Sequence, residues 1–202
     1  MHFFDAAYQG SPPWDIGRPQ PAFVRLEESG EVAGRVLDVG CGTGENALYF
    51  ARRGHATWGV DFAPTPIQRA REKSSERGVP ARFEVADALA LEALEARFDT
   101  ITDCGLFHTF DDDERPRYAK SLLGVLEPPG RVHILCFSER EPADWGGPRR
   151  VTRPEIRATF RAPWQVRSIR AERFATRFED GRGEAWLATL TLRTRRRSGV
   201  RD

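Results

Sequence analysis

Short apolar runs alternate with helix-like patterns along most of this chain. Runs rich in β-branched and aliphatic residues predict strands near 35–40, 56–61, 81–86, 98–104 and 130–137. Apolar residues at helical spacing predict helices near 44–54, 66–78, 90–96 and 112–126. Strands that alternate with helices in this way are typical of a mostly parallel sheet with helices on both faces.

The pattern changes beyond the fifth expected strand. A helix is expected near 153–161, followed by two β-rich stretches at 164–174 and 184–194. The glycine-rich link at 179–183 is short enough for an antiparallel hairpin. The sequence therefore predicts an α/β fold whose seven-stranded, mostly parallel sheet ends in an antiparallel hairpin.

Two of the expected helices have marked starts. Thr65-Pro-Ile-Gln68 offers a cap residue, a proline at the first helical position and a glutamine at the third, which together make a capping box. Thr152-Arg-Pro-Glu155 repeats the arrangement. We expect helices to begin directly after Thr65 and Thr152.

The segment before the first strand has a composition of its own. Residues 1–34 mix aromatic residues with prolines, and a short helix is expected around 21–29. We therefore divide the chain into an N-terminal lid or cap segment (1–34), an α/β domain (35–194) and a basic tail (195–202).

Composition and charge exclude several classes of protein. With 202 residues, 40% of them apolar and 30% charged, the chain has the make-up of one soluble domain. The net charge of +1 gives no general attraction to nucleic acid or to membranes, and no apolar run approaches the roughly 20 residues of a membrane span. The first residues lack a secretory pattern, so the expected location is cytoplasmic. Three cysteines without C-x-x-C spacing predict neither a disulfide framework nor a metal site.

Residues 35–44, Arg-Val-Leu-Asp-Val-Gly-Cys-Gly-Thr-Gly, carry the strongest functional signal. Glycine stands at every second position, at Gly40, Gly42 and Gly44, between an expected strand and an expected helix. Glycine lets the backbone adopt positive φ and approach a ligand, and the helix that follows points free N–H groups at it. The pattern indicates a nucleotide-like cofactor over this loop.

The spacing of the loop narrows the choice of cofactor. A phosphate-binding loop would need a lysine after its last glycine, and a dinucleotide loop would read G-x-G-x-x-G, whereas this loop reads G-x-G-x-G. Asp38 would repel a pyrophosphate but suits a ligand with an ammonium group. Asp61 ends the second expected strand, 21 positions after Gly40, where a carboxylate can accept both ribose hydroxyls. Adenosine joined to an amino acid is the implied ligand.

Three motifs together resemble those of class I S-adenosylmethionine-dependent methyltransferases. They are L-D-V-G-C-G-T-G at 37–44, G-V-D-F at 59–62 and A-D at 86–87. More narrowly, residues 13–21, 44–48 and 105–110 resemble small actinobacterial methyltransferases that act on heterocyclic or benzoquinone-type hydroxyls, with thiopurine and tellurite-resistance methyltransferases as more distant relatives. The resemblance implies a Rossmann-like sheet with one antiparallel strand inserted beside the fifth, S-adenosylmethionine as cofactor and S-adenosylhomocysteine as product.

The resemblance also implies roles for individual residues. Asp38 would support the glycine loop and the ammonium group, and Asp61 would hold the ribose. Phe62 would pack against adenine, whose amino group Asp87 would bind. The whole expected cofactor set is Trp14, Asp38, Gly40, Cys41, Gly42, Gly44, Asn46, Asp61, Phe62, Asp87, Ala88 and Asp103.

The N-terminal segment would fold over the cofactor in such a protein. Trp14 and the region of Gln20 would then lie near its methionine end and exclude water, which methyl transfer needs. Trp14 could equally anchor the segment to the sheet. We expect residues 1–20 to be a mobile lid that is ordered mainly when cofactor is bound.

His108 is the expected catalytic residue. It follows the fourth expected strand, close to where the methyl group should project. Its ordinary pKa of about 6.5 suits a general base that removes the proton of a hydroxyl acceptor. A histidine at this position could instead hydrogen-bond the cofactor or cap the helix that follows.

Aromatic residues near the same sheet edge predict an apolar acceptor site. Its expected lining is Phe107, Phe110, Phe137 and Trp145. Nearby, Arg149 and Arg150 could pair with an anionic acceptor.

The expected activity is methyl transfer to the hydroxyl, or a ring nitrogen, of a small aromatic or heteroaromatic acceptor by in-line displacement. The acceptor is the expected partner, with no nucleic acid or membrane, and the chain would be a monomer or a weak homodimer. Two alternatives stay open: a thiol, selenol or halide methyltransferase, which needs no base, and a non-catalytic cofactor-binding module.

Overall fold

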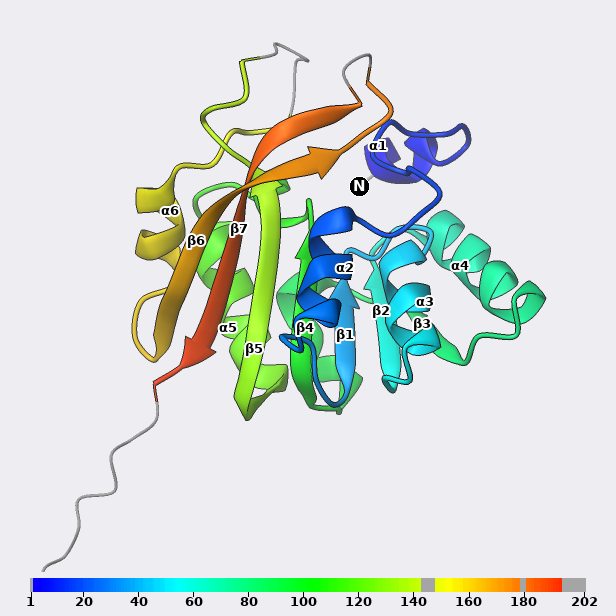
Figure 1. The fold of residues 1–202 in the computed structure, drawn as a ribbon, viewed down its shortest axis with the longest axis horizontal. Helices are drawn as coiled ribbons and strands as arrows, with labels where there is room; N and C mark the ends of the chain where they lie inside the picture. The colour runs from blue at the N-terminus through cyan, green and yellow to red at the C-terminus, as the bar shows by residue number, and fades with distance from the viewer. Residues whose placement is uncertain (1, 143–147, 179–180, 194–202) are drawn as a thin grey trace, which may run out of the picture.

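A seven-stranded sheet runs through the protein, in the order β3-β2-β1-β4-β5-β7-β6 (Figure 1). The structure is a computed structural model that describes residues 2–142, 148–178 and 181–193. The strands are β1 (Val36–Val39), β2 (Thr57–Asp61), β3 (Ala81–Val85), β4 (Phe98–Cys104), β5 (Leu126–Phe137), β6 (Trp164–Ala175) and β7 (Arg182–Leu192). Strands β1 to β5 pair in parallel, and β7 is antiparallel to both β5 and β6. The expected fold is therefore confirmed, including the inserted antiparallel strand.

Helices cover both faces of this sheet. They are α1 (His2–Ala7), α2 (Pro21–Glu28), α3 (Glu45–Arg52), α4 (Pro64–Glu76), α5 (Glu114–Val125) and α6 (Arg153–Thr159), with the 3₁₀ helices η1 (Ala88–Leu94) and η2 (Phe107–Thr109). Figure 1 shows α2 and α3 in front of the sheet and α5 behind it. None of the helices in the described residues is long and apolar enough to span a membrane.

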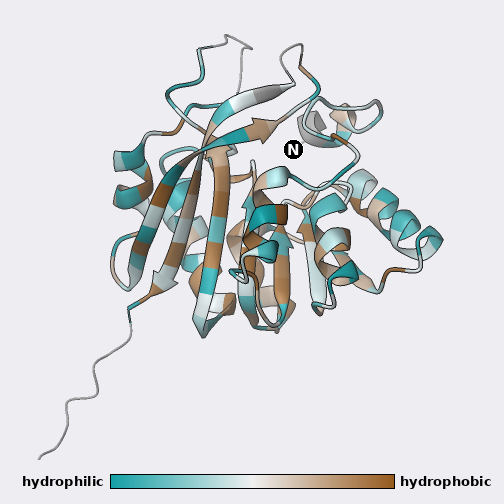
Figure 2. Ribbon diagram, viewed as in Figure 1, coloured by the Kyte–Doolittle hydropathy of each residue, from teal (hydrophilic) through white to brown (hydrophobic). Residues whose placement is uncertain are grey.

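The apolar strands form the core between the two helical layers. Val36, Leu37 and Val39 of β1 are fully buried, and the strand is covered on both faces, as expected for a central parallel strand. Figure 2 shows the apolar residues concentrated in the sheet and polar ones on the outer side of α4. This arrangement leaves the carboxyl ends of the parallel strands as the edge at which a site can form.

The two expected capping boxes have different outcomes. The box at Thr152 is confirmed, because its hydroxyl accepts from Glu155 N and the Glu155 carboxylate accepts from Thr152 N. The box at Thr65 is wrong, because α4 already begins at Pro64. The backbone N–H of Thr65 instead donates to the carboxylate of Asp5 in α1 (3.1 Å). A long-range contact thus replaces a local cap.

The expected helix near 90–96 is also different in the structure. It is the 3₁₀ helix η1, which is interrupted at Ala90 (φ −144°, ψ 42°). The Asp87 side chain accepts from Leu89 N (2.8 Å) and caps its start. Short 3₁₀ segments often serve as connectors, and here the segment brings Asp87 and Ala88 to the end of β3.

Candidate functional site

One large cavity, of about 1140 Å³, lies at the carboxyl ends of the parallel strands. Figure 1 shows α1 and the bent ends of β6 and β7 above this edge of the sheet. The sequence-predicted residues that line the cavity are Trp14, Gly40, Cys41, Gly42, Asn46, Asp61, Phe62, Ala88, His108, Phe110 and Phe137. The structure therefore brings most of the expected cofactor and acceptor residues to one place.

The glycine loop can have this shape only with glycine at its alternate positions. Gly40, Gly42 and Gly44 all have positive φ (67°, 53° and 83°). A Cβ on Gly42 would lie 2.6 Å from the hydroxyl oxygen of Tyr8, and one on Gly44 would lie 2.8 Å from the ring of Phe83. Gly42 thus lets the N-terminal segment approach the loop. Gly44, the N-cap of α3, supports the loop from the core side and does not line the cavity.

Asp61 fixes the loop from the end of β2. Its Oδ2 accepts from the backbone N–H of Gly42 and its Oδ1 from that of Ala63, both at 2.9 Å. Burial raises the pKa of this carboxyl. The next residue, Phe62, is 44% exposed and lines the cavity, so a large apolar ring borders it beside the carboxylate. The carboxylate of Asp61 can accept from two adjacent hydroxyls of a ligand, and the ring of Phe62 can pack against a flat apolar group.

Asp38 lies beneath the loop, outside the cavity lining. Its Oδ1 accepts from the Thr102 hydroxyl (2.8 Å), whereas its Oδ2 has no hydrogen-bond partner among the described residues. Burial raises the pKa of Asp38 to about 7. A buried carboxylate oxygen without a partner is costly, so a positive group near the loop would be favoured here.

Asp87 and Asp103 have structural contacts that the sequence did not reveal. Asp87 is exposed, caps η1 and does not line the cavity, although its neighbours Ala86 and Ala88 do. Asp103 is fully buried, and it accepts from the hydroxyl of Tyr118 (2.7 Å) and from two backbone N–H groups of the following turn. Direct cofactor contacts of Asp87 and Asp103 stay predictions. The oxygens of Asp103 accept from the turn after β4 and from Tyr118 of α5, which connects β4 to α5.

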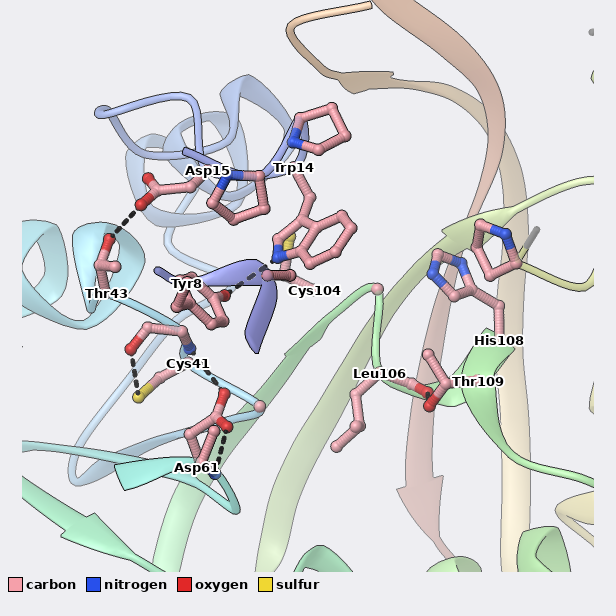
Figure 3. A pocket seen from close by; sticks show the side chains of 18 of the residues that line it. Tyr8, Trp14, Asp15, Cys41, Thr43, Asp61, Cys104, Leu106, His108 and Thr109 are labelled. Atoms are coloured by element: carbon pink, nitrogen blue, oxygen red, sulfur yellow. Dashed lines mark hydrogen bonds between the residues drawn. The ribbon is translucent and has the colours of Figure 1, made fainter. Parts of the chain in front are cut away.

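The N-terminal segment is connected to the loop by a chain of hydrogen bonds. Trp14 Nε1 donates to the Tyr8 hydroxyl (3.0 Å), which lies against Gly42, and the Thr43 hydroxyl donates to Asp15 (2.9 Å) (Figure 3). Both Tyr8 and Asp15 line the cavity. Their sequence positions do not reveal these roles, because the roles depend on how an irregular segment folds back.

Gln20 anchors the other end of this segment. Its Nε2 donates to Ala175 O (2.8 Å), its Oε1 accepts from Ala175 N (3.0 Å), and its backbone N–H donates to Asn46 (2.9 Å). Gln20 is only 3% exposed. The segment is thereby tied at one point to the end of β6 and to the start of α3.

His108 lies on the opposite wall of the cavity from Tyr8 and Trp14 (Figure 3). Its Nδ1 accepts from the backbone N–H of Phe137 (3.1 Å), and its ring stacks on that of Phe137 (centroids 5.0 Å apart, interplanar angle 9°). Burial lowers the pKa of His108 to about 3, with smaller effects from Arg150 and Arg115. The hypothesis that His108 is a general base assumes an ordinary histidine pKa, and this buried environment does not give His108 such a pKa.

Aromatic side chains form the wall around His108. Phe110 and Phe137 line the cavity as expected, and Phe174 and Phe178 from the hairpin join them. Phe107 differs from the expectation, because it is fully buried in the core between Tyr118 and Phe160. The remaining acceptor residue predicted from sequence, Trp145, lies outside the described residues. The hairpin aromatics were missed because sequence alone does not show which end of a strand bends over the site.

Comparison with known proteins gives a consistent family. A methyltransferase domain model matches residues 36–130. The 2-heptyl-1-hydroxyquinolin-4(1H)-one methyltransferase of Mycobacteroides abscessus is 38% identical, over 88% of this chain and 84% of that protein. A probable thiol methyltransferase of Arabidopsis thaliana is 33% identical, over 69% of this chain and 62% of its own length.

A similar solved structure comes from work on the conversion of a disulfide bond into a thioacetal group during echinomycin biosynthesis. It is 39% identical, with a TM-score of 0.85, over 94% of this chain and 90% of that one.

Proposed function

Because the chain belongs to the S-adenosylmethionine-dependent methyltransferases, we propose that it methylates the hydroxyl oxygen of a small aromatic or heteroaromatic acceptor. The observation that carries this proposal is the placement of an aromatic wall and the glycine loop around one cavity. A relative of similar length that acts on a hydroxyquinolinone supports it.

The residues of the cavity fit S-adenosylmethionine. The positive-φ glycines leave room where a Cβ would collide, Asp61 offers carboxylate oxygens at the end of β2, and Phe62 offers an exposed ring. Asp38 lies beneath the loop and does not line the cavity, so it would favour the ammonium group through the loop and not by direct contact. When bound, this cofactor supplies an electrophilic methyl group on a sulfonium centre.

In such a displacement the protein's role is to align the reactants and to exclude water. Charge disperses as a nucleophile approaches a sulfonium methyl, so a dry site and a fixed approach contribute most of the acceleration. The wall of Phe110, Phe137, Phe174 and Phe178 can hold a flat acceptor ring, and the segment around Trp14 covers the cavity.

A panel of acceptors tests the proposed function. The protein is incubated with labelled S-adenosylmethionine and phenols, hydroxyquinolines, thiols or iodide, and label transfer is measured. We expect hydroxylated heteroaromatics to react with a kcat/KM at least about tenfold above that of any thiol or of iodide. Preference for thiols would contradict the proposal.

A sulfur acceptor is the second candidate. Two observations favour it: the likeness to a probable thiol methyltransferase, and the likeness to the structure from work on a disulfide conversion. The same panel separates the two, because a thiol acceptor would give label transfer in the absence of any aromatic hydroxyl.

Limited proteolysis tests the proposed lid at residues 1–20. The hydrogen bonds of Trp14, Asp15 and Gln20 close this segment over the cavity, so a bound ligand should keep it closed. At S-adenosylhomocysteine concentrations 100 times its Kd, cleavage between Gly10 and Gln20 should slow by up to about 100-fold, if cleavage requires ligand release. Equal cleavage rates with and without ligand would contradict a lid.

A further inference from the structure

The backbone of β5 fixes His108 in one hydrogen-bonding arrangement. A backbone N–H can only donate, so the bond from Phe137 N makes Nδ1 the accepting nitrogen of the imidazole (3.1 Å). A neutral imidazole whose Nδ1 accepts carries its proton on Nε2. The nitrogen that remains available to a ligand in the cavity is therefore a donor.

Packing keeps the ring in this orientation. His108 is 5% exposed and lies against the rings of Phe137 and Phe174, with centroids 5.0 and 6.0 Å away. Turning the ring over would place a carbon against the N–H of Phe137 and leave that donor unpaired, which is costly in a buried site.

A general base would need the opposite arrangement. Histidines that remove protons present a bare Nε2, while Nδ1–H donates to a carboxylate or carbonyl. In His108 the partner of Nδ1 is instead a donor, the backbone N–H of Phe137. The charged groups that act on the ring are Arg150, from the loop after β5, and Arg115 of α5. Both are cations, and they oppose protonation of the imidazole.

The other titratable side chains that line the cavity, among the described residues, are poorly suited to act as a general base. They either accept hydrogen bonds from the protein or are kept protonated by burial. The carboxylates are Asp15, Glu45, Asp61 and Asp111, and each accepts hydrogen bonds from the chain itself. Asp111, the nearest to His108 in sequence, accepts from Asp113 N and Glu114 N at the start of α5. Burial raises the pKa of the Tyr8 hydroxyl and of the Cys41 and Cys104 thiols, which keeps all three protonated.

We infer that the cavity takes its methyl acceptor already ionised, as an oxyanion, and that Nε2–H of His108 holds this anion. The inference rests on the proposed function and specifies its acceptor class: groups that lose their proton near or below neutral pH. Arg150, whose guanidinium carbon lies 5.7 Å from the Phe137 ring centroid, adds positive charge on the same side.

The bond changes then balance without a base. The anion forms a bond to the methyl carbon, while the methyl–sulfur bond breaks and its electron pair stays on sulfur. The proton of the acceptor has gone to solvent before binding, so no side chain takes it up. Since the acceptor loses charge during transfer, a donor to it stabilises the bound anion more than the transition state, and its removal should affect binding more than kcat.

The first test reads the tautomer directly and needs no acceptor. Imidazole ¹⁵N spectra of the protein with S-adenosylhomocysteine, assigned by comparison with His108→Phe, should show His108 protonated at Nε2, bare at Nδ1 and unchanged between pH 5 and 9. A proton on Nδ1, or titration near neutrality, would overturn the inference whether or not the proposed acceptor is right.

The second test compares substitutions with and without a donor. His108→Phe keeps an aromatic ring and should raise the Kd of an anionic acceptor roughly 10- to 100-fold, with kcat changed only a few-fold. His108→Gln keeps an N–H donor but cannot act as a base, and it should restore Kd to within several-fold of the original protein. Equal loss of kcat in both variants, by about 10²–10⁴-fold, would mean a base.

The third test follows pH across acceptors of different acidity. The midpoint of kcat/KM against pH should equal the pKa of each acceptor and move with it. A midpoint common to all acceptors would indicate an enzyme base and would contradict the inference. An acceptor panel that gives no transfer at all would count against the proposed function, while the imidazole spectra would still decide the tautomer.

Discussion

Asp61→Ala should weaken binding of S-adenosylmethionine by about 10²–10⁴-fold. The carboxylate is proposed to bind two ribose hydroxyls, and hydrogen bonds to a charged group contribute roughly 1.5–3 kcal/mol each. The same carboxylate also holds the backbone N–H groups of Gly42 and Ala63 at 2.9 Å. The substitution therefore removes both a ligand contact and the support of the loop.

Burial of Asp61 increases the effect that we expect on cofactor binding. Because burial raises the pKa of Asp61, the fold holds its charged form at a cost, and donors from a ligand would offset that cost. Asp61→Asn keeps the shape and one acceptor oxygen, so its affinity should lie between those of the original protein and Asp61→Ala. Isothermal titration calorimetry on variants that melt cooperatively measures each affinity.

A matched control is Asp113→Ala, an exposed acid at the N-cap of α5 that makes no side-chain cap hydrogen bond. Its cofactor affinity should stay within about twofold of the original, since surface substitutions away from special features usually change little. Unchanged affinity in a folded Asp61→Ala variant would remove Asp61 from the site.

The elements of the fold could be predicted where the signal is local. The strands and most helices followed from periodicity, although α1 did not. The Thr152 capping box depends on residues three positions apart. The start of α4 could not be predicted, because the backbone of Thr65 is bound by Asp5, 60 positions earlier. The 3₁₀ character of η1 likewise depends on packing against α5, where Leu91 N donates to Ser121.

The part of the site that could be predicted most directly from the sequence is the glycine loop with Asp61. These residues follow two strands whose carboxyl ends lie at the same edge of the sheet, and their spacing in the sequence is typical of a cofactor-binding loop. Their relative positions could therefore be predicted from the sequence. His108 was placed correctly in the cavity, but its tautomer depends on a backbone N–H at Phe137, 29 positions away. The chemistry of a histidine is set by such partners, which no spacing rule reveals.

Gln20→Ala should detach the N-terminal segment and lower the stability of the fold. The side chain pairs with both backbone groups of Ala175, and each buried polar group left without a partner costs roughly 1–3 kcal/mol. We therefore expect a loss of roughly 2–6 kcal/mol in the free energy of unfolding, measured with denaturant, if the two groups stay buried.

Amide exchange offers a second measurement of the hydrogen bonds between Gln20 and Ala175. If the segment separates from β6 instead of straining, amide exchange at Ala175 should accelerate and cofactor affinity should fall, because Gln20 also donates to Asn46 in the cavity wall. Gln68→Ala is the matched control, since this exposed glutamine of α4 donates to Glu72 one turn further along the same helix (3.1 Å). The free energy of unfolding of this variant should change by less than about 0.5 kcal/mol. Gln20→Glu separates packing from hydrogen bonding. It keeps the acceptor for Ala175 N but sets a carboxylate oxygen against Ala175 O, so it should destabilise the fold at least as much as alanine does. A Gln20→Glu variant as stable as the original protein would mean that the side chain fills space at this junction and does not hold it.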